Sequence, residues 1–220
     1  MATDRQRSIV IGVALGALIL LSLPFTLWSL RAGLALPLSL DLSENRFYAL
    51  GADTSNLAIF AHMVLGALLM AVAPLQVWPG LRARFAGYHR WAGRLACTAA
   101  ALTGLAGLGY IAARGTIGGV WMDLGFALYG GLMVLCAGQA IHHARQRDFS
   151  VHRRWALRLL VLIFGSWLYR VHYGLWYLMT GGAASTPAFD GAFDLVQNFA
   201  FYLPYLLVLE LWLRRNPRPA

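Results

Sequence analysis

The sequence contains no lysine, only two cysteines and few charged residues of either sign. Of its 220 residues, 12% are charged and 59% are hydrophobic, whereas a soluble domain carries roughly 25% charged residues. This composition excludes a soluble globular domain and predicts a membrane protein. Cys97 and Cys136 both lie inside apolar segments, and no CxxC pair is present. The cysteines therefore predict no disulfide framework.

Motifs of several enzyme classes are also missing from the chain. It has no Gly-rich phosphate loop, no HExxH motif and no nucleophile–base arrangement. The net charge of +9 comes entirely from arginine, and these arginines lie at the ends of apolar segments, where membrane orientation explains them. A nucleic-acid partner is therefore excluded. An all-arginine set of basic residues is associated with GC-rich bacterial genomes, which favours the bacterial cytoplasmic membrane as the location.

Six apolar segments are long enough to cross a bilayer, which takes about 20 helical residues. The predicted fold is therefore all-α, a single polytopic transmembrane bundle over residues 1–220 with a four-helix core made of the second to fifth spans. The first segment exceeds the roughly 7–15 apolar residues of a secretory signal, so we expect an uncleaved helix, most simply a signal anchor. The connection over residues 31–56 has room for a short interfacial helix. The predicted spans are residues 8–30, 57–78, 91–112, 120–141, 153–179 and 195–213.

The arginines predict the orientation of these spans. With the N-terminus in the cytoplasm, 14 of the 18 arginines fall on the inner side and 4 on the outer side. The positive-inside rule then places both termini in the cytoplasm. The outer arginines are Arg31, Arg46, Arg114 and Arg170.

Two short phrases suggest an internal repeat. Residues 89–95 read HRWAGRL and residues 152–159 read HRRWALRL, so one inserted arginine separates two otherwise similar phrases. Each phrase opens a predicted span after a basic turn. One interpretation is that spans 2–3 and spans 4–5 are two parallel helix hairpins that arose by duplication. The alternative is convergence, because arginine and aromatic residues are favoured at any inner membrane interface.

The fifth predicted span carries more basic residues than a membrane segment normally tolerates. Its helical periodicity puts three of them, with three other residues, on one stripe, which we expect to face the protein interior or a water-filled cavity. Arg158 is expected to find an acceptor near the inner face and Arg170 near the outer face, with Asp123 as a candidate. The stripe comprises Arg154, Arg158, Gly165, Tyr169, His172 and Trp176.

Two histidines of the predicted core lie at similar depth in the outer half of the membrane. His62 lies about five residues, and His172 about six residues, inside the outer end of its span. Because a helix rises about 1.5 Å per residue, the two histidines are expected at similar depth. Gly66 and Gly165 lie on the same stripes and leave room beside them. Two facing imidazoles of a four-helix bundle suit the axial sites of haem b. The alternative is that each histidine is a hydrogen-bonding contact between helices.

A second candidate site lies at the inner face. His89 and His152 begin the two repeated phrases, and neighbouring arginines have the charge to pair with haem propionates. Histidines in basic interfacial turns are equally explained as neighbours of lipid head groups. The candidate residues are His89, Arg90, Arg94, His152, Arg153 and Arg158.

Several of these motifs together resemble a known family. They are His62-x-x-x-Gly66, Gln76, Leu81-Arg-x-Arg84, His89-Arg90-x-x-Gly93-Arg94, His152-Arg-x-Trp-x-x-Arg158 and Pro204-x-Leu-x-x-x-Glu210. Over roughly residues 57–215 the chain resembles a prokaryotic membrane-protein family catalogued as domain of unknown function 2306. The resemblance implies a multi-helix membrane protein without an established activity, and His172 is not part of its pattern.

Three functions remain open at this stage. The first is a haem b-binding electron-transfer protein or membrane oxidoreductase. The second is an accessory or scaffold subunit of a larger membrane complex, because tryptophans and small residues suit contacts with lipid and other helices. The third is a small-molecule transporter or binding protein that uses the stripe from Arg158 through Tyr169 to His172.

Overall fold

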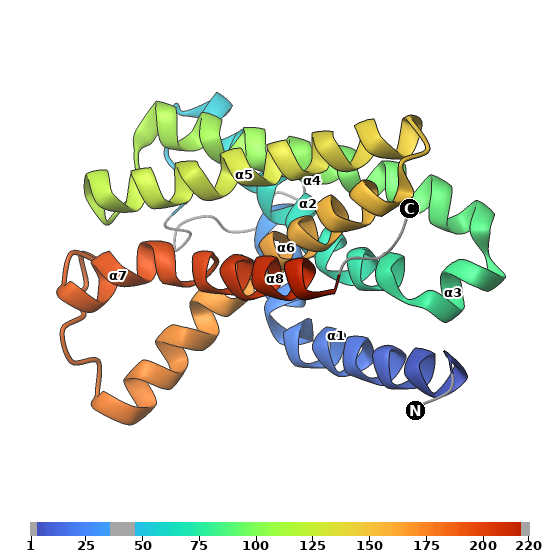
Figure 1. Ribbon diagram of the computed structural model, residues 1–220. Helices are drawn as coiled ribbons and strands as arrows, with labels where there is room; N and C mark the ends of the chain where they lie inside the picture. Colours follow the sequence, from blue (N-terminus) through green and yellow to red (C-terminus); the bar gives the residue numbers. More distant parts are fainter. Residues whose placement is uncertain (1–3, 36–46, 217–220) are drawn as a thin grey trace.

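A computed structural model describes residues 4–35 and 47–216, and these residues form helices joined by turns, without a strand. The all-α prediction is therefore confirmed for the described part of the chain. The interfacial helix considered for residues 31–56 falls largely outside it. The helices are α1 (Asp4–Leu34), α2 (Asp53–Val77), α3 (Pro79–Arg84), α4 (Ala86–Arg114), α5 (Gly119–Arg145), α6 (Phe149–Thr180), α7 (Ala192–Ala200) and α8 (Leu203–Arg215), as labelled in Figure 1.

Four long helices form the core of the bundle. α2 packs on α4, α4 on α5 and α5 on α6, and a smaller contact between α6 and α2 completes the arrangement. Small residues bring the axes close together, because a Cβ added at Gly104 of α4 would lie 2.8 Å from the carbonyl oxygen of Gly130 in α5. α4, α5 and α6 are closely packed around Ala100, Ala137 and Leu162, which are fully buried.

Five stretches of the described chain are long and apolar enough to cross a membrane: α1 from Ser8, α2, α4, α5, and α7 with α8 together. α6 is not among them, although it is 32 residues long. Its arginines, histidines and tyrosines lower its hydropathy. The prediction of a membrane helical bundle is confirmed. The prediction that α6 is a sixth span is supported only by the length of α6 and its packing in the core.

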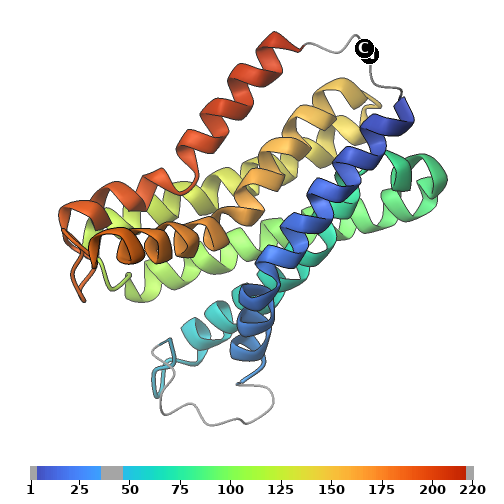
Figure 2. The ribbon, with the colours of Figure 1, turned by 90° about the horizontal axis from the view of Figure 1, so that it is seen from below.

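The last predicted span, residues 195–213, is not one continuous helix. It is interrupted at Phe201 and Tyr202, between α7 and α8. Pro204 contributes to this break, because proline has no backbone N–H to donate and is tolerated only in the first turn of a helix. Tyr202 is fully buried and its hydroxyl donates to the carbonyl oxygen of Gly125 at 3.1 Å, which fixes the break against α5. α8 then diverges from the core (Figure 2).

The basic turn predicted after the second span contains the short helix α3, and the turn before α6 ends in a helix cap. Asp148 accepts a hydrogen bond from the backbone N–H of Val151 at 3.2 Å. This bond, together with one from the Ser150 hydroxyl, lowers the pKa of the Asp148 carboxyl. A side-chain oxygen in this position satisfies one of the unpaired N–H groups at a helix start.

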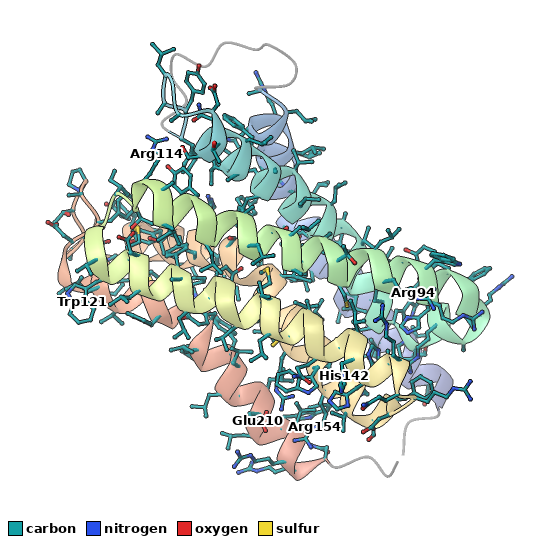
Figure 3. All side chains as sticks on the ribbon, turned by 90° about the horizontal axis from the view of Figure 1, so that it is seen from above. Arg94, Arg114, Trp121, His142, Arg154 and Glu210 are labelled. Atoms are coloured by element: carbon teal, nitrogen blue, oxygen red, sulfur yellow. The ribbon has the colours of Figure 1, made fainter. Side chains whose placement is uncertain are left out.

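The basic residues gather at one end of the molecule. Figure 3 shows Arg94, His142 and Arg154 at that end, with Arg114 at the other. The start of α1 and the end of α8 also lie on the arginine-rich side (Figure 2). The hairpins α2–α4 and α5–α6 therefore run in parallel, and the two repeated phrases occupy equivalent places at the starts of α4 and α6.

Candidate ligand cavity between the core helices

A cavity of about 610 Å³ lies among the core helices, in the half of the bundle remote from the arginine-rich end. α2, α4, α5 and α6 all contribute to its wall, and α1 covers one side through Phe25, Trp28 and Ser29. Most of the wall is apolar. Its polar side chains include Ser29, His62, Thr103, Tyr110, Thr116, Tyr129, Ser166, Tyr169, Arg170, Tyr173 and Tyr177.

His62 presents a hydrogen-bonding group on this wall. Its Nδ1 lies 2.9 Å from the carbonyl oxygen of Thr103, and because a carbonyl only accepts, Nδ1 carries the proton. The neutral ring then keeps Nε2 as an acceptor. The hydroxyl Oγ1 of Thr103 is buried without a partner among the described residues, although Thr103 also lines the cavity. A buried hydroxyl normally has a partner, so Thr103 is an unsatisfied polar group next to the cavity.

Two glycines make room beside His62. Gly107 of α4 lies under the imidazole ring, and a Cβ there would come within 3.2 Å of His62 Nδ1. Gly66 lines the cavity one helical turn from His62, and a Cβ at Gly66 would meet no atom within 4 Å. Gly66 therefore contributes open volume, as predicted from its place on the His62 stripe.

A chain of hydroxyl groups leads from the cavity to a buried carboxylate. The hydroxyl of Tyr169 donates to that of Tyr173 at 3.4 Å, and Tyr173 donates to Asp194 at 2.6 Å. Asp194 is fully buried at the start of α7. It also accepts hydrogen bonds from Ser185, and from the backbone of Thr186 and Gly191. The carboxylate thus fixes the loop between α6 and α7, whose Phe189 lines the cavity.

Arg170 lies on the side of the cavity nearest α1. Its guanidinium is 4.3 Å from the ring centroid of Phe25 and 5.4 Å from that of Trp28. It also donates to the carbonyl oxygen of Ser166 at 3.0 Å. The predicted partner Asp123 instead accepts the backbone N–H of Thr116 at 2.6 Å. Asp123 therefore caps the turn before α5, and the neighbours of Arg170 include two aromatic rings.

The structure does not bring His62 and His172 to one cavity. His172 Nδ1 lies 3.1 Å from the side chain of Gln197 in α7, and its Nε2 lies 2.7 Å from the hydroxyl of Tyr205 in α8. His172 is not among the residues that line the cavity. Joint ligation of a haem requires His172 to exchange both hydrogen bonds and to turn away from α7 and α8.

Gly165 also has a different use from the one predicted. A Cβ there would lie 2.8 Å from the ring of Tyr129, whose hydroxyl donates to the carbonyl oxygen of Leu162. The glycine lets this tyrosine cross from α5 to the backbone of α6. The space beside Gly165 is therefore occupied by the ring of Tyr129.

The residues of the second candidate site gather at the arginine-rich end, where most of them contact other side chains or the backbone of the protein. His152 Nδ1 donates to the carbonyl oxygen of Ala140 at 2.8 Å. Arg94 and Arg153 lie over tryptophan rings, at 5.2 and 5.5 Å from the centroids. His89 Nδ1 is buried without a hydrogen bond in the described chain, and Arg90 is exposed. The described residues contain no group of three or more His, Cys, Asp or Glu side chains that could hold a metal ion.

Arg158 has the acceptor that its burial requires, and that acceptor is Glu210. Arg158 Nη2 lies 2.5 Å from Glu210 Oε2, and this pair joins α6 to α8. Arg154 and Arg214 lie 3.6 and 3.5 Å from the other carboxylate oxygen. Glu210 is therefore more than the partner of Arg214 at a solvated helix end, because it binds three guanidinium groups.

The cavity face of α6 was missed in the sequence. Ser166, Arg170, Tyr173 and Tyr177 recur at intervals of three or four residues, which is the helical signal for a shared face. The predicted stripe from Arg154 to His172 faces elsewhere: its arginines contact Glu210 of α8, and His172 contacts α7 and α8.

Comparison with known proteins identifies a family but no characterised relative. The family model described as "Predicted membrane protein (DUF2306)" matches residues 59–213. The matched range holds nearly all of the four core helices and excludes α1. No match was found among curated proteins or among solved structures.

Proposed function

The chain belongs to the family of membrane proteins catalogued as domain of unknown function 2306, and we propose that it binds a small organic molecule in the cavity between its core helices. The observation that carries this proposal is the cavity itself, at about 610 Å³. Ligand sites of roughly 300–1,000 Å³ between helices are typical of proteins that hold molecules of drug size.

The wall of the cavity supports binding rather than a closed structural core. Protein interiors are close-packed, with few voids larger than a water molecule. Four methionines, whose flexible side chains adapt to differently shaped ligands, alternate with aromatic rings on this wall. His62, Thr103 and Arg170 are among the polar residues that line it. The wall methionines are Met63, Met70, Met122 and Met133.

The proposal is tested by filling the cavity without disturbing its wall. Gly66→Phe places an aromatic ring where a Cβ meets no neighbour. Gly131→Phe is the matched control, because Gly131 is exposed in the middle of α5 and its Cβ position is equally open. Both variants and the unmodified protein are purified in mild detergent, and the small molecules extracted from each are compared by mass spectrometry.

We expect a molecule that is enriched in the unmodified protein and in Gly131→Phe but absent from Gly66→Phe. Thermal unfolding of all three proteins in detergent shows whether Gly66→Phe is folded. An identical extract from a folded Gly66→Phe protein contradicts a ligand site in this cavity.

The haem b alternative rests on His62, which keeps Nε2 as an acceptor on the cavity wall. A single imidazole suffices for a five-coordinate haem, as in globins, so electron transfer through the His62–His172 pair is not required. The absorption spectrum after haem-replete expression tests it. A Soret band that is lost in His62→Ala and kept in His172→Ala supports haem at His62, and no band in the folded protein removes this function.

Six crossings with both termini in the cytoplasm complete the proposal, in the bacterial cytoplasmic membrane. The support is the arginine-rich end, which holds the turns α2–α4 and α5–α6 and the end of α8. Reporter fusions after Arg84, Arg147 and Arg215 are expected to read cytoplasmic, and those after Gly118 and Asp190 external. An external signal after Arg147 contradicts this orientation. Copurifying membrane subunits at fixed ratio would favour the accessory role instead.

A further inference from the structure

One hydrogen-bonding atom on the cavity wall is left without a partner by the described chain. This atom is Nε2 of His62, since Nδ1 of the same ring is already bonded to the carbonyl oxygen of Thr103 at 2.9 Å. No hydrogen bond from the described residues reaches Nε2, and the atom is not enclosed by protein. Because Nδ1 carries the only N–H of the neutral ring, Nε2 accepts and does not donate. A ligand at this point of the wall must therefore supply the hydrogen.

A second, smaller cavity adjoins the first at His62, which lines both. Its volume is about 60 Å³. The space lies between α4 and α5, where Gly104, Gly107 and Gly130 have no side chains to fill it. A water molecule takes about 30 Å³, so the smaller cavity has room for a polar group of one or two atoms and not for an apolar chain. The polar end of a ligand is therefore expected at His62, with the remainder in the larger cavity.

Aromatic rings surround the junction of the two cavities. Phe126 and Tyr129 of α5 line both of them, and their ring centroids lie 6.4 Å apart in an edge-to-face arrangement. Trp28 and Tyr173 line the larger cavity. Aromatic rings pair favourably at centroid distances of about 4.5–7 Å, so this wall suits a flat ring. An apolar cavity of about 150 Å³ already accepts benzene, and the larger cavity, at about 610 Å³, has room for a chain on that ring as well.

The wall also limits the charge of the ligand. Among the described residues that line the two cavities there is no aspartate or glutamate. A cationic amine would therefore be buried without a carboxylate to pair with, which is costly. Ionised carboxylates, ketones and ethers present acceptors only, so their oxygens would face the lone pair of His62 Nε2. A neutral hydroxyl group meets both conditions.

We infer that the cavity binds a phenol or hydroquinone ring that carries an apolar chain, with a ring hydroxyl donating to Nε2 of His62. This inference rests on the proposed function, because it names the class of molecule that the same cavity holds. The hydroxyl lies at the junction with the smaller cavity, and the chain lies along the larger one. Monophenols and hydroquinones share the required donor, and the experiment below distinguishes them.

Binding is measured by gel filtration of the purified full-length protein in detergent buffer that contains the probe. The excess of probe in the protein peak gives the amount bound, and the part that Gly66→Phe removes is the part held in the cavity. The probe is para-heptylphenol, and its methyl ether has the same ring and chain without the donor. The alcohol para-heptylcyclohexanol keeps the hydroxyl on a saturated ring. Heptylhydroquinone, kept reduced with ascorbate, and its benzoquinone compete with the probe, and only the reduced form has a donor.

The variants isolate the acceptor on His62. His62→Phe keeps a ring and removes the acceptor, whereas His62→Gln retains an amide that donates to the Thr103 carbonyl and an oxygen that accepts from the ligand. His142→Phe is the matched control, since His142 is exposed at the arginine-rich end (Figure 3) and lines neither cavity. We expect the unmodified protein and His142→Phe to bind the phenol about tenfold more tightly than its methyl ether, the effect of one buried hydrogen bond. This ratio should fall to about one in His62→Phe and be partly kept in His62→Gln. The hydroquinone should likewise compete about tenfold more strongly than the quinone.

Each outcome points in one direction. If Gly66→Phe removes bound probe but the unmodified protein holds the phenol and its ether equally, the cavity is a ligand site and the hydroxyl class is wrong. A preference for the phenol that persists in a His62→Phe protein shown to be folded by thermal unfolding contradicts recognition by His62. Equal binding of the phenol and the cyclohexanol contradicts the aromatic class, and so does a phenol that binds no better to the unmodified protein than to Gly66→Phe. The proposed function fails separately, when the small molecules extracted from folded Gly66→Phe match those of the unmodified protein.

Discussion

The ion pair between α6 and α8 predicts an asymmetric response to mutation. Removing Arg158 leaves Glu210 with two further guanidinium groups, at 3.6 and 3.5 Å. Removing the Glu210 carboxylate leaves Arg154 and Arg158 facing each other at i,i+4 without an acid between them. We therefore expect Glu210→Gln to destabilise the protein more than Arg158→Leu does.

The magnitudes follow from burial. The side chains of Arg158 and Glu210 are 19% and 28% exposed, so this ion pair is intermediate between an exposed and a buried one. An exposed pair contributes about 0–1 kcal/mol, whereas disruption of a buried pair costs about 3–5 kcal/mol. We expect about 1–2 kcal/mol for Arg158→Leu and about 2–4 kcal/mol for Glu210→Gln, which adds the like-charge repulsion of the two arginines. The coupling between the two mutations should be about 1–2 kcal/mol.

The assay is reversible unfolding in mixed micelles, in which dodecyl sulfate is titrated against a mild detergent and tryptophan fluorescence is followed. The double mutant completes a cycle with the two single mutants. Arg145→Leu, at the exposed end of α5, and Arg214→Gln, whose side chain is 72% exposed, should each change stability by less than about 0.5 kcal/mol. If Arg158→Leu costs more than Glu210→Gln, or the coupling is near zero, the carboxylate is not the centre of this contact.

Three further substitutions test how the outer half is held together. Asp194→Asn should cost about 2–3 kcal/mol and increase hydrogen exchange over residues 181–191, because an amide accepts fewer of the hydrogen bonds that the carboxylate now receives. Tyr202→Phe should cost about 1–2 kcal/mol, since it leaves the buried carbonyl of Gly125 without its hydroxyl donor. Gly125→Ala should cost about 1–3 kcal/mol because its Cβ would lie 2.5 Å from the backbone oxygen of Asn198. Gly131→Ala, in open space, should be neutral or stabilising, and equal effects of the two glycine substitutions would contradict the packing of α7 on α5.

Hydropathy and charge predicted the fold well because both act along the chain. Apolar runs determine where helices cross a bilayer, and arginines gather at one end of these helices, so α2, α4, α5 and α6 were each found to within a few residues. The break at Phe201 was missed because it depends on contacts distant in sequence. The Tyr202 hydroxyl is anchored on α5, and no period along residues 195–213 reports that bond.

The candidate site was predicted only in part, and the reason lies in helix rotation. Depth along a helix can be counted in residues, and both His62 and Gly66, which were assigned to one stripe, line the cavity. The neighbour that a side chain faces depends instead on how its helix is rotated about its own axis, which cannot be counted along the sequence. His172 shares the depth of His62, but α6 turns it toward Gln197 and Tyr205, while Arg170, two residues earlier, lines the cavity.

The two hairpins contribute different chemistry to the same cavity. The first, α2 with α4, provides the imidazole of His62, held by the backbone carbonyl of Thr103. The second, α5 with α6, provides the Tyr129 ring and the Arg170 guanidinium, the single fixed charge of the described wall. The repeated phrases lie at the opposite end, where both hairpins turn in the same basic surroundings. A duplicated hairpin would keep its likeness at such a shared interface and lose it where the two copies face each other across the cavity, and the likeness in this chain is at the basic end, in residues 89–95 and 152–159.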